Sequence, residues 1–409
     1  MTDSAGIPDA TGAAGGSPEP RRGRRRRLLL RWAGAGASLL VLAGAATGWW
    51  LYRKLDANIT EDTSAAAELE RFERERPTPI AGGSRNILLI GSDSRSGSDN
   101  SRYGRDGGTG RSDTVILLHL PADRRSATAV SVPRDLMTDV PSCLRPDGSR
   151  TAEQFAQFNW AFQWGGAGCT IRTVEKLTGI RIDHHMVVDF GGFKKMVDAV
   201  GGVEICLKQP MNDPKTRLRL PAGRQTLRGE QALGFVRARY SMGDGSDTER
   251  MERQQQFLGA LVKKVQSNGV LLNPGRLYPL LDAATSSVTT DPGLASLRGL
   301  YELVRGVRDI PTDQVKFLTV PRRPYAADPN RDELAQPDAT RLFQRLRADE
   351  PLTVAPPAES DAPEGADGRK PDAARPGEAS TEPSPAGTAT GPAPVPTFTG
   401  TTAGMTDCR

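Results

Sequence analysis

Residues 86–95 read NILLIGSDSR, an apolar run that ends in glycine, serine and aspartate. Apolar runs of about four to eight residues that stop at turn residues are typical of strands buried on both faces. Similar runs occur at 114–120 and 127–132, and the segment 96–110 between the first two is rich in Gly, Ser and Asp, as loops are. We therefore predict three strands of a buried central sheet.

Around these strands, extended and helical patterns alternate along the chain. Short apolar runs predict further strands at 186–190, 203–207 and 316–320. Helical periodicity predicts helices at 170–178, 192–200, 248–267, 277–284, 294–307 and 339–347. Because alternating strands and helices are typical of α/β folds, we expect a three-layer α-β-α sandwich with a central mixed sheet.

The N-terminal segment has the pattern of a membrane anchor. Six arginines between positions 21 and 27 precede an uncharged run from Trp32 to Tyr52, which is long enough for the roughly 20 residues that span a bilayer. Clustered positive charge stays on the cytoplasmic side, so we expect one transmembrane helix with the main domain outside the cytoplasm. A cleaved signal peptide with its site at 43–45 is the alternative.

These patterns divide the chain into five parts. A charged helix at 64–76 ends before Pro77, and the last part is rich in Pro, Ala and Gly. We expect a disordered basic cytoplasmic segment at 1–31, the transmembrane helix at 32–52, a stalk at 53–83, a globular domain at 84–350 and a flexible tail at 351–409. An anchored piece at 397–409 is the alternative for the end of that tail.

Charge and cysteine content narrow the class of protein. The pI is 9.1, but residues 1–31 account for four of the formal +5 charges, so the rest is close to neutral and nucleic acid is not an expected partner. Outside the cytoplasm, cysteines tend to form disulfides. We expect Cys143 to pair with Cys169. Cys206 and Cys408 could form a second bridge, but this pairing stays open because four cysteines allow three connectivities.

Standard catalytic motifs are absent from the sequence, which contains no GxSxG, HExxH or complete GxxxxGK[ST] pattern. Adjacent His184 and His185 would point to opposite faces of a strand, so we interpret them, with His119, as structural residues. What remains is a set of acids, arginines and one glutamine near the ends of predicted elements: Asp93, Arg111, Asp113, Arg134, Asp135, Arg237, Arg239, Arg250 and Gln254.

The members of this set should meet at one edge of the sheet, because ligands of open α/β sheets bind where strand ends and loops converge. Arg237 and Arg239 would share one face of an extended segment, and Arg250 and Gln254 one face of a helix. Guanidinium groups bind phosphate oxygens through paired hydrogen bonds, and two aspartates can hold a magnesium ion. The set therefore predicts a diphosphate site, although any single arginine could instead be a surface salt-bridge residue.

Several longer stretches now add a family resemblance. They are NILLIGSDSR (86–95), RSDTVILL (111–118), AVSVPRDL (129–136), FNWAF (158–162), VDFGGFKKMVDAVGGVEI (188–205) and ALGFVRARYSMGDGSDTERMERQQQFL (232–258). Together they resemble the LytR-CpsA-Psr family of cell-wall glycopolymer ligases from about Arg85 to Leu258, with weaker support to about Pro351. Cys143, Cys169 and the closing FTGTTAGMTDC resemble actinobacterial members.

The resemblance implies a function and a role for each site residue. Family members transfer a glycan linked to undecaprenyl pyrophosphate onto peptidoglycan, with magnesium. By resemblance, Asp93 and Asp113 would hold Mg²⁺, and Arg237, Arg239 and Asp113 would be catalytic. The pyrophosphate would bind to Arg111, Arg134, Arg237, Arg239, Arg250 and Gln254. Apolar helices beside the sheet would hold the polyprenyl chain. The long 96–110 segment, which stretches the spacing between Asp93 and Asp113, is a departure from many members.

Three other functions stay open at this point. The domain could hydrolyse a lipid-linked diphosphate, act as a non-enzymatic membrane-anchored regulator, or bind the wall as a scaffold. The segment before the membrane helix is too short for a DNA-binding domain, which disfavours the regulator. We expect a phosphotransferase at the cell membrane whose partners are a polyprenyl-pyrophosphate-linked glycan, peptidoglycan and membrane lipid. Asp135 and Asp247 are the candidates for a general base.

Overall fold

The computed structural model describes residues 21–80, 82–93, 110–238, 247–266, 274–356 and 395–405. The chain divides into two compact units, Met1–Lys54 and Leu55–Arg409. Helix α1 (Arg21–Ala57) supplies the described part of the first unit, and its last three residues belong to the second. Its segment Leu29–Ala57 is the one stretch of the described residues long and apolar enough to cross a membrane, which fits a single-pass membrane protein. This stretch extends beyond the expected span at both ends.

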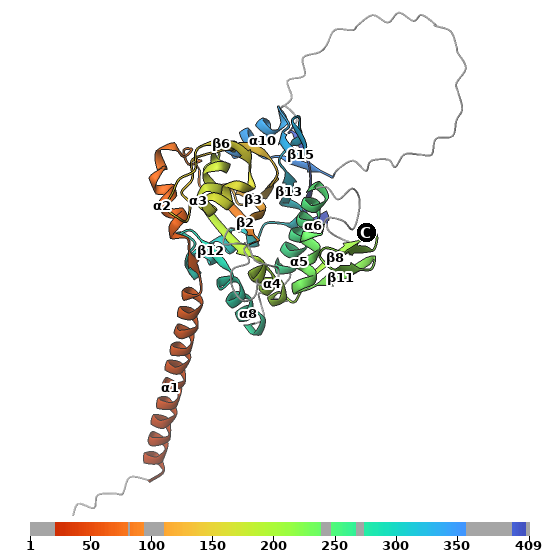
Figure 1. Cartoon of the computed structure of the whole chain (residues 1–409). Coiled ribbons are helices and arrows are strands. Elements are labelled where there is room, and N and C mark those ends of the chain that lie inside the picture. Colours follow the sequence, from red (N-terminus) through yellow and green to blue (C-terminus); the bar gives the residue numbers. More distant parts are fainter. Residues whose placement is uncertain are drawn as a thin grey trace, which may run out of the picture. The chain divides into compact units, whose positions relative to one another are not determined.

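A nine-stranded mixed sheet forms the centre of the second unit (Figure 1). The strand order is β1-β12-β7-β2-β3-β4-β13-β17-β16. Strands β7, β2, β4 and β13 run in one direction, and β12, β3 and β17 run antiparallel to their neighbours among these four. In sheet order, the strands span Thr60–Glu61, Val288–Thr290, His184–Asp189, Arg85–Ser92, Ser112–Leu120, Ala127–Val132, Val315–Thr319, Thr397–Thr402 and Thr353–Ala355.

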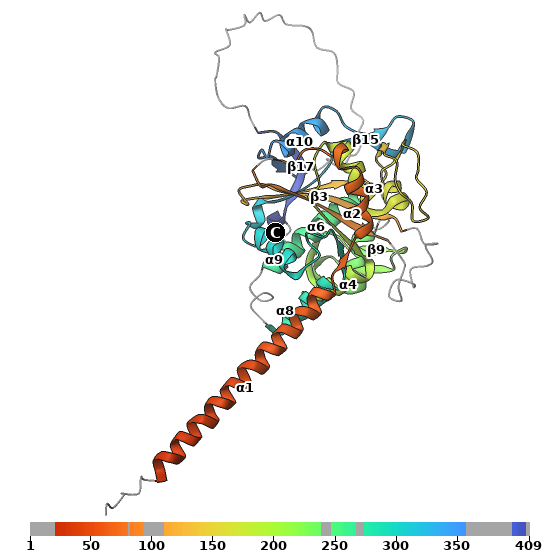
Figure 2. The same cartoon turned by 90° about the vertical axis from the view of Figure 1, so that its left-hand side faces the viewer.

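The central strands are apolar on both faces because a layer of helices packs on each face. On β2, Leu88 and Ile90 point to one core, which also contains residues of α2 (Thr63–Arg71), α3 (Asn159–Thr178) and α10 (Asp338–Arg347). Ile87 and Leu89 point to the opposite core, beneath α6 (Asp247–Gln266) and α9 (Leu297–Arg308). Figures 1 and 2 show these helices around the sheet. The expected α-β-α sandwich is confirmed.

A second, smaller core adjoins the sandwich. It is formed by α4 (Phe190–Ala199), α5 (Gly229–Arg237) and two hairpins, with α8 (Pro274–Thr285) packed against it. The hairpins pair β8 (Val203–Leu207) with β11 (Gly223–Leu227) and β9 (Met211–Asp213) with β10 (Leu218–Leu220). Helix α6 belongs to both cores, because Phe257 is fully buried in the smaller one while Leu258 packs on the sheet side.

Two further hairpins flank the sheet near the end of β4. One pairs β5 (Met137–Val140) with β6 (Gln154–Gln157), and the other pairs β14 (Arg322–Tyr325) with β15 (Asp328–Leu334). A bridge between Leu136 and Asp332 connects the two regions. Neither hairpin was expected from the sequence, because their short strands lack an apolar run.

The segment expected as a stalk packs on the domain instead. Strand β1 joins the sheet, and Asp62 caps α2 by accepting a hydrogen bond of 2.9 Å from the Ala65 N–H. Glu68 on α2 is only 5% exposed and accepts hydrogen bonds from Arg150 and Arg172, which lie 82 and 104 residues further along the chain. Burial raises the pKa of the Glu68 carboxyl, but the two guanidinium groups outweigh burial and hold that pKa below its ordinary value. The short 3₁₀ turn η1 (Glu73–Glu75) follows.

The segment 351–409, which was expected to be a flexible tail, contains a strand near each of its ends. Strand β16 forms just after position 351, and β17 inserts between β13 and β16, so Thr397–Thr402 corresponds to the anchored-piece alternative. Burial alternates along β17, with Phe398 and Thr402 facing inward, and the 3₁₀ turn η4 (Ala403–Met405) ends this piece. Residues 357–394 and Cys408 lie outside the described residues.

Candidate active site

The sheet topology brings the ends of several strands to one edge. Because β7, β2, β4 and β13 are parallel, their carboxyl ends meet at the same edge as the start of β3. Asp93 follows β2, Arg111 precedes β3, and Arg134 comes two residues after β4. This is the edge at which open α/β sheets bind their ligands.

A β-bulge sets the position of Asp113. In the β2–β3 ladder, Gly91 pairs with Thr114 but Ser92 pairs with Ser112, so Asp113 is the extra residue. Bulges re-aim a side chain and occur often beside active sites. The Asp113 carboxylate accepts a hydrogen bond of 3.1 Å from Nη1 of Arg134, and both side chains are one quarter exposed.

Asp93 and Arg111 are held together through the backbone. The Asp93 N–H donates to the Arg111 carbonyl at 2.8 Å, and the Arg111 N–H donates to the Asp93 carboxylate. Arg111 itself is exposed at this edge. Asp93 and Asp113 therefore flank one cross-strand pair, Ser92 and Ser112.

Asp135 orients Arg134 from the other side. Its carboxylate accepts hydrogen bonds of 3.0 Å from Nε of Arg134 and 2.9 Å from Nε2 of Gln157, and Arg331 lies 3.6 Å away. A carboxylate engaged by these donors is suited to positioning a guanidinium rather than to accepting a proton from a substrate. Sequence reasoning missed Gln157 and Arg331, because both belong to the unexpected hairpins.

Arg237 is the last residue of α5, not part of an extended segment as the sequence suggested. The stretch from Ala232 to Val236 buries an apolar helical face, and only Ala238 returns to extended backbone. The Arg237 guanidinium lies 4.4 Å from the ring centroid of Phe190, the first residue after β7. Because β7 is the neighbour of β2, Arg237 is placed at the same edge of the sheet. Arg239 lies outside the described residues.

Arg250 and Gln254 share the buried side of α6. They are 4% and 8% exposed, and Gln254 donates a hydrogen bond of 3.2 Å to the Val236 carbonyl. Nearby Arg253 donates to the Ala238 carbonyl at 2.7 Å, and Gln255 contacts the hydroxyls of Ser131 and Thr319. The start of α6 thus links the end of α5 to the ends of β4 and β13. Asp247, the second candidate for a general base, is the first residue of α6, but its side chain is not among those that the structure describes.

The donor set at Asp93 and Asp113 suits a hard cation. Magnesium in proteins usually takes one or two carboxylates, keeps several waters and adds substrate phosphate oxygens. Two carboxylates on adjoining strand ends supply that number of protein ligands. The site would thus rest on two protein ligands, because the described residues contain no cluster of three or more His, Cys, Asp and Glu side chains that could hold a metal ion.

The three histidines have structural partners away from this edge. His119 bonds to Asn86 at 2.8 Å and to Asp349 at 3.0 Å, and His184 contacts Asp291 at 2.9 Å. His185 Nε2 lies 3.4 Å from Asp62. Asn86 and His184 stand at the amino ends of β2 and β7, which is the opposite edge of the sheet.

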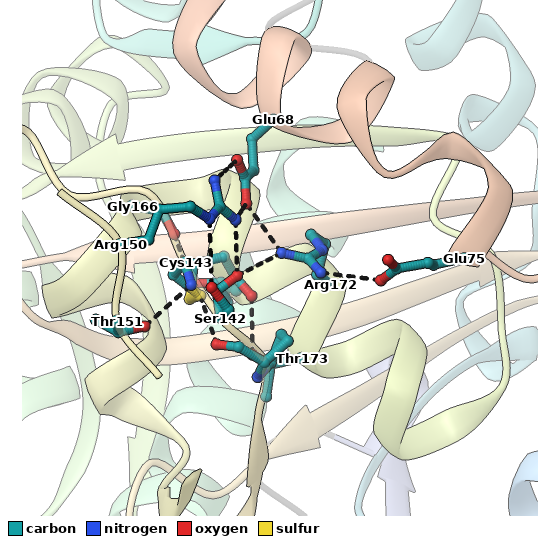
Figure 3. Close-up of a disulfide and its surroundings, with 12 residues drawn as sticks. Glu68, Glu75, Ser142, Cys143, Arg150, Thr151, Gly166, Arg172 and Thr173 are labelled. Atoms are coloured by element: carbon teal, nitrogen blue, oxygen red, sulfur yellow. Dashed lines mark hydrogen bonds and ion pairs between the residues drawn. A yellow bond between two sulfur atoms is a disulfide. The ribbon is translucent and has the colours of Figure 1, made fainter. Parts of the chain in front are cut away.

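A disulfide braces the chain that follows Arg134. Cys143 and Cys169 are bonded and fully buried, which confirms the expected pair. Figure 3 shows the disulfide beside Glu68, Arg150 and Arg172. The bond ties α3 to the segment after β5, while the Asn159 N–H at the start of α3 donates to the Arg134 carbonyl at 3.1 Å. Cys206 is also disulfide-bonded.

The family model described as the LytR_cpsA_psr family matches residues 55–347. This range begins just before β1, ends with α10 and contains all the candidate site residues. The chain belongs to the LytR_cpsA_psr family. The resemblance seen in the sequence motifs is confirmed.

Two curated relatives illustrate the range of similarity. The chain is 40% identical over 236 residues to the probable cell wall biosynthesis protein LcpB of Corynebacterium glutamicum, covering 56% of this chain and 54% of LcpB. It is 27% identical over 322 residues to the polyisoprenyl-teichoic acid–peptidoglycan teichoic acid transferase TagV of Bacillus subtilis, covering 78% of this chain and 76% of TagV. The chain thus spans about half the length of LcpB.

The fold is also found in a solved family structure. The LytR-Csp2A-Psr enzyme from Actinomyces oris superimposes with a TM-score of 0.53 and 21% identity, covering 66% of this chain and 93% of that one. This likeness concerns the fold. It agrees with the mixed central sheet and the helices on both of its faces.

Proposed function

We propose that the protein transfers a polyprenyl-pyrophosphate-linked glycopolymer to peptidoglycan and leaves a phosphodiester bond between them. The observation that carries this proposal is the contact of Arg134 with Asp113 at the carboxyl edge of the sheet, beside Asp93 and Arg111. Guanidinium and carboxylate groups in this arrangement suit a metal-bound diphosphate. The substrate class is supported by TagV, whose name describes transfer of a polyisoprenyl-linked polymer to peptidoglycan.

In the proposed reaction, a hydroxyl oxygen of the acceptor attacks the phosphorus next to the glycan. A new P–O bond forms, and the bond from that phosphorus to the bridging oxygen breaks. Polyprenyl phosphate leaves with the electron pair, and the hydroxyl proton passes to the leaving phosphate or to water. Such transfers depend mainly on positioning and charge stabilisation, so no protein nucleophile is required.

The arginines would stabilise the charge on the phosphate oxygens. Arg134 is suited to this role because Asp113 and Asp135 hold its guanidinium from two sides. Arg237 would add a second cation from the end of α5, stacked on Phe190. Arg111, exposed at the start of β3, would contact the same diphosphate. Arg239, Arg250 and Gln254 would complete the set of diphosphate ligands.

We also propose Mg²⁺ as the cofactor, held by Asp93 and Asp113. When bound, such an ion polarises phosphoryl oxygens and orients the leaving group. Asp113 would then face both the ion and Arg134, while Asp135 remains a positioning residue for Arg134.

We propose an orientation in which the arginine cluster at 21–27 lies in the cytoplasm and the second unit lies outside it. The proposed substrates are a lipid-linked glycan and the cell wall, which are accessible on that side. The oxidised Cys143–Cys169 pair is consistent with an extracytoplasmic domain. Protease treatment of intact cells should degrade the second unit, and protection of that unit would contradict this orientation.

The function is tested with the purified full-length protein in detergent, given a short-chain lipid-pyrophosphate glycan and Mg²⁺, with and without peptidoglycan. We expect lipid monophosphate to be released and glycan to become attached only when peptidoglycan is present. The Arg237→Ala variant should lose this transfer, whereas Arg298→Ala, a change at an exposed arginine on α9, should keep it. Rapid release of soluble glycan phosphate without an acceptor would instead identify a hydrolase.

A further inference from the structure

Two aromatic side chains lie near the Arg134–Asp135 pair and have no part in the proposed chemistry. Phe155 on β6 is 53% exposed, although it is a large apolar residue. Its ring centroid lies 6.0 Å from that of Tyr325 on β14, with the two planes tilted by 53°. Exposed apolar groups that gather beside a polar site often mark a binding surface. We call Phe155 and Tyr325 the aromatic pair.

Strand β6 connects Phe155 to the candidate active site. Phe155 and Gln157 are two residues apart, so their side chains lie on the same face of the strand. Gln157 donates a hydrogen bond of 2.9 Å to the Asp135 carboxylate, and Asp135 accepts from Nε of Arg134. Phe155 therefore lies one two-residue repeat along β6 from Gln157, which contacts the Asp135 carboxylate that positions Arg134.

The β14–β15 hairpin connects Tyr325 to the same point. The Asp332 N–H on β15 donates to the Asp135 carbonyl at 3.2 Å, and Arg331 lies 3.6 Å from the Asp135 carboxylate. On the β14 strand, Arg323 is exposed and paired with Glu333. The two rings thus come from hairpins that both contact Asp135, and the aromatic pair borders the site on the side of β4 and β13.

We propose that the aromatic pair stacks against the pyranose rings of the acceptor glycan strand; this inference rests on the proposed transfer to peptidoglycan. A pyranose ring has an apolar C–H face and a rim of hydroxyls. An aromatic surface covers that face, while polar neighbours such as Arg331 reach the rim. Stacking here would hold the acceptor hydroxyl close to the phosphorus that Arg134 stabilises.

The chemistry of the two substrates favours the acceptor over the glycan of the lipid-linked donor. The donor brings a diphosphate, which the proposed arginines bind through its charge. The acceptor brings sugar rings and hydroxyls instead, and these suit a surface made of the aromatic pair and a polar neighbour such as Arg331.

The test is calorimetric binding of lipid-free, soluble peptidoglycan glycan fragments to the full-length protein in detergent. We expect the double variant Phe155→Ala/Tyr325→Ala to bind the fragments about tenfold more weakly than the wild type. The matched control is Tyr301→Ala, which removes an aromatic residue that is 62% exposed on α9 and should leave binding unchanged. The variant Phe155→Leu/Tyr325→Leu keeps apolar side chains without rings and should also bind weakly, and thermal unfolding checks that each variant is folded.

A second arm separates acceptor from donor. In the transfer reaction, the double alanine variant should have an acceptor KM about tenfold higher and a donor KM within about twofold of the wild type. Fragment binding equal to that of the wild type would overturn the proposal, and so would a change confined to the donor KM. Fragment binding does not require the transfer reaction, so the two proposals can fail separately. If the wild type forms no phosphodiester, the proposed transfer is contradicted. If the double alanine variant still binds the fragments more weakly than that wild type, the aromatic pair is supported.

Discussion

Nη1 of Arg134 lies 3.1 Å from Oδ1 of Asp113, across the ends of two neighbouring antiparallel strands. The contact depends on the bulge that displaces Asp113 from the β2–β3 ladder. It joins the residue proposed to stabilise phosphate charge to one of the two carboxylates proposed to hold Mg²⁺.

Replacing Arg134 should abolish most transfer without unfolding the protein. In Arg134→Ala the charge near the phosphate is lost, and we expect kcat/KM for transfer to fall by about 10²–10³. Arg134→Lys should also be impaired, because one ammonium cannot bond to Asp113 and Asp135 in the way that a planar guanidinium does. Arg323→Ala, at an exposed arginine on β14, serves as the control and should stay active. Wild-type rates in Arg134→Ala would remove this residue from the mechanism.

Replacing Asp113 by its neutral isostere should weaken the use of magnesium. We expect Asp113→Asn to need a Mg²⁺ concentration at least about tenfold higher for half-maximal transfer, because a carboxylate ligand of a hard cation has been neutralised. Chelation with EDTA should stop transfer by the wild type, and added Mg²⁺ should restore it. The control is Asp139→Asn on β5, an exposed position. An EDTA-resistant wild type would contradict the proposed cofactor.

Removing the Cys143–Cys169 disulfide should lower the free energy of unfolding by about 3 kcal/mol, since the bond closes a loop with a sequence separation of 26. The double variant Cys143→Ala/Cys169→Ala should show this as a lower urea midpoint of the full-length protein. We also expect weaker transfer, because α3 and the segment after Arg134 lose a covalent connection. An unchanged midpoint would show that the loop is held by packing alone.

The charge on Asp62 should make stability depend on acid pH. Burial raises the pKa of Asp62, but contacts from His185, the Ala65 N–H and Ser64 outweigh burial and lower that pKa to about 2. The folded state therefore favours the ionised form, and this contribution is present above pH ~4 and is lost as the pH falls toward ~2.

The matching variant is Asp62→Asn, which retains a residue that can cap α2 but removes the charge. We expect it to be about 1–2 kcal/mol less stable than the wild type at pH 7, with the difference shrinking as the pH falls toward ~2. Urea unfolding at several pH values measures this. Asp309→Asn, at a carboxylate that is 80% exposed, should show no such difference. A gap between wild type and Asp62→Asn that stays constant with pH would contradict the role of the charge.

Local patterns in the sequence predicted the centre of the fold. The runs at 86–90, 114–120 and 127–132 are uninterrupted because their strands are covered on both faces, and α6 was predicted within one residue at each end. The sequence also placed Asp93, Arg111, Asp113 and Arg134 beside strand ends, and strand direction then brings them to one edge. These features depend on residues close to each other in the chain.

The features that were missed depend on distant contacts. Glu68 belongs to the domain because Arg150 and Arg172 bind it, and β17 is a strand because β13 pairs with it. Arg237 was assigned to an extended segment because the spacing of Arg237 and Arg239 was read as strand alternation, whereas packing of Phe235 in the smaller core makes the segment helical. The bulge at Asp113 is set by pairing with β2, which no local pattern reveals.

The most direct test follows the phosphorus atoms of the donor. A lipid-pyrophosphate glycan labelled only at the phosphorus next to the glycan is incubated with the full-length protein, Mg²⁺ and peptidoglycan, and the label is located. We expect it in the peptidoglycan, between wall and glycan, and we expect a label at the lipid-proximal phosphorus to stay with the polyprenyl phosphate. Recovery of the glycan-proximal label as soluble glycan phosphate, with none in the wall, would contradict the proposed transfer.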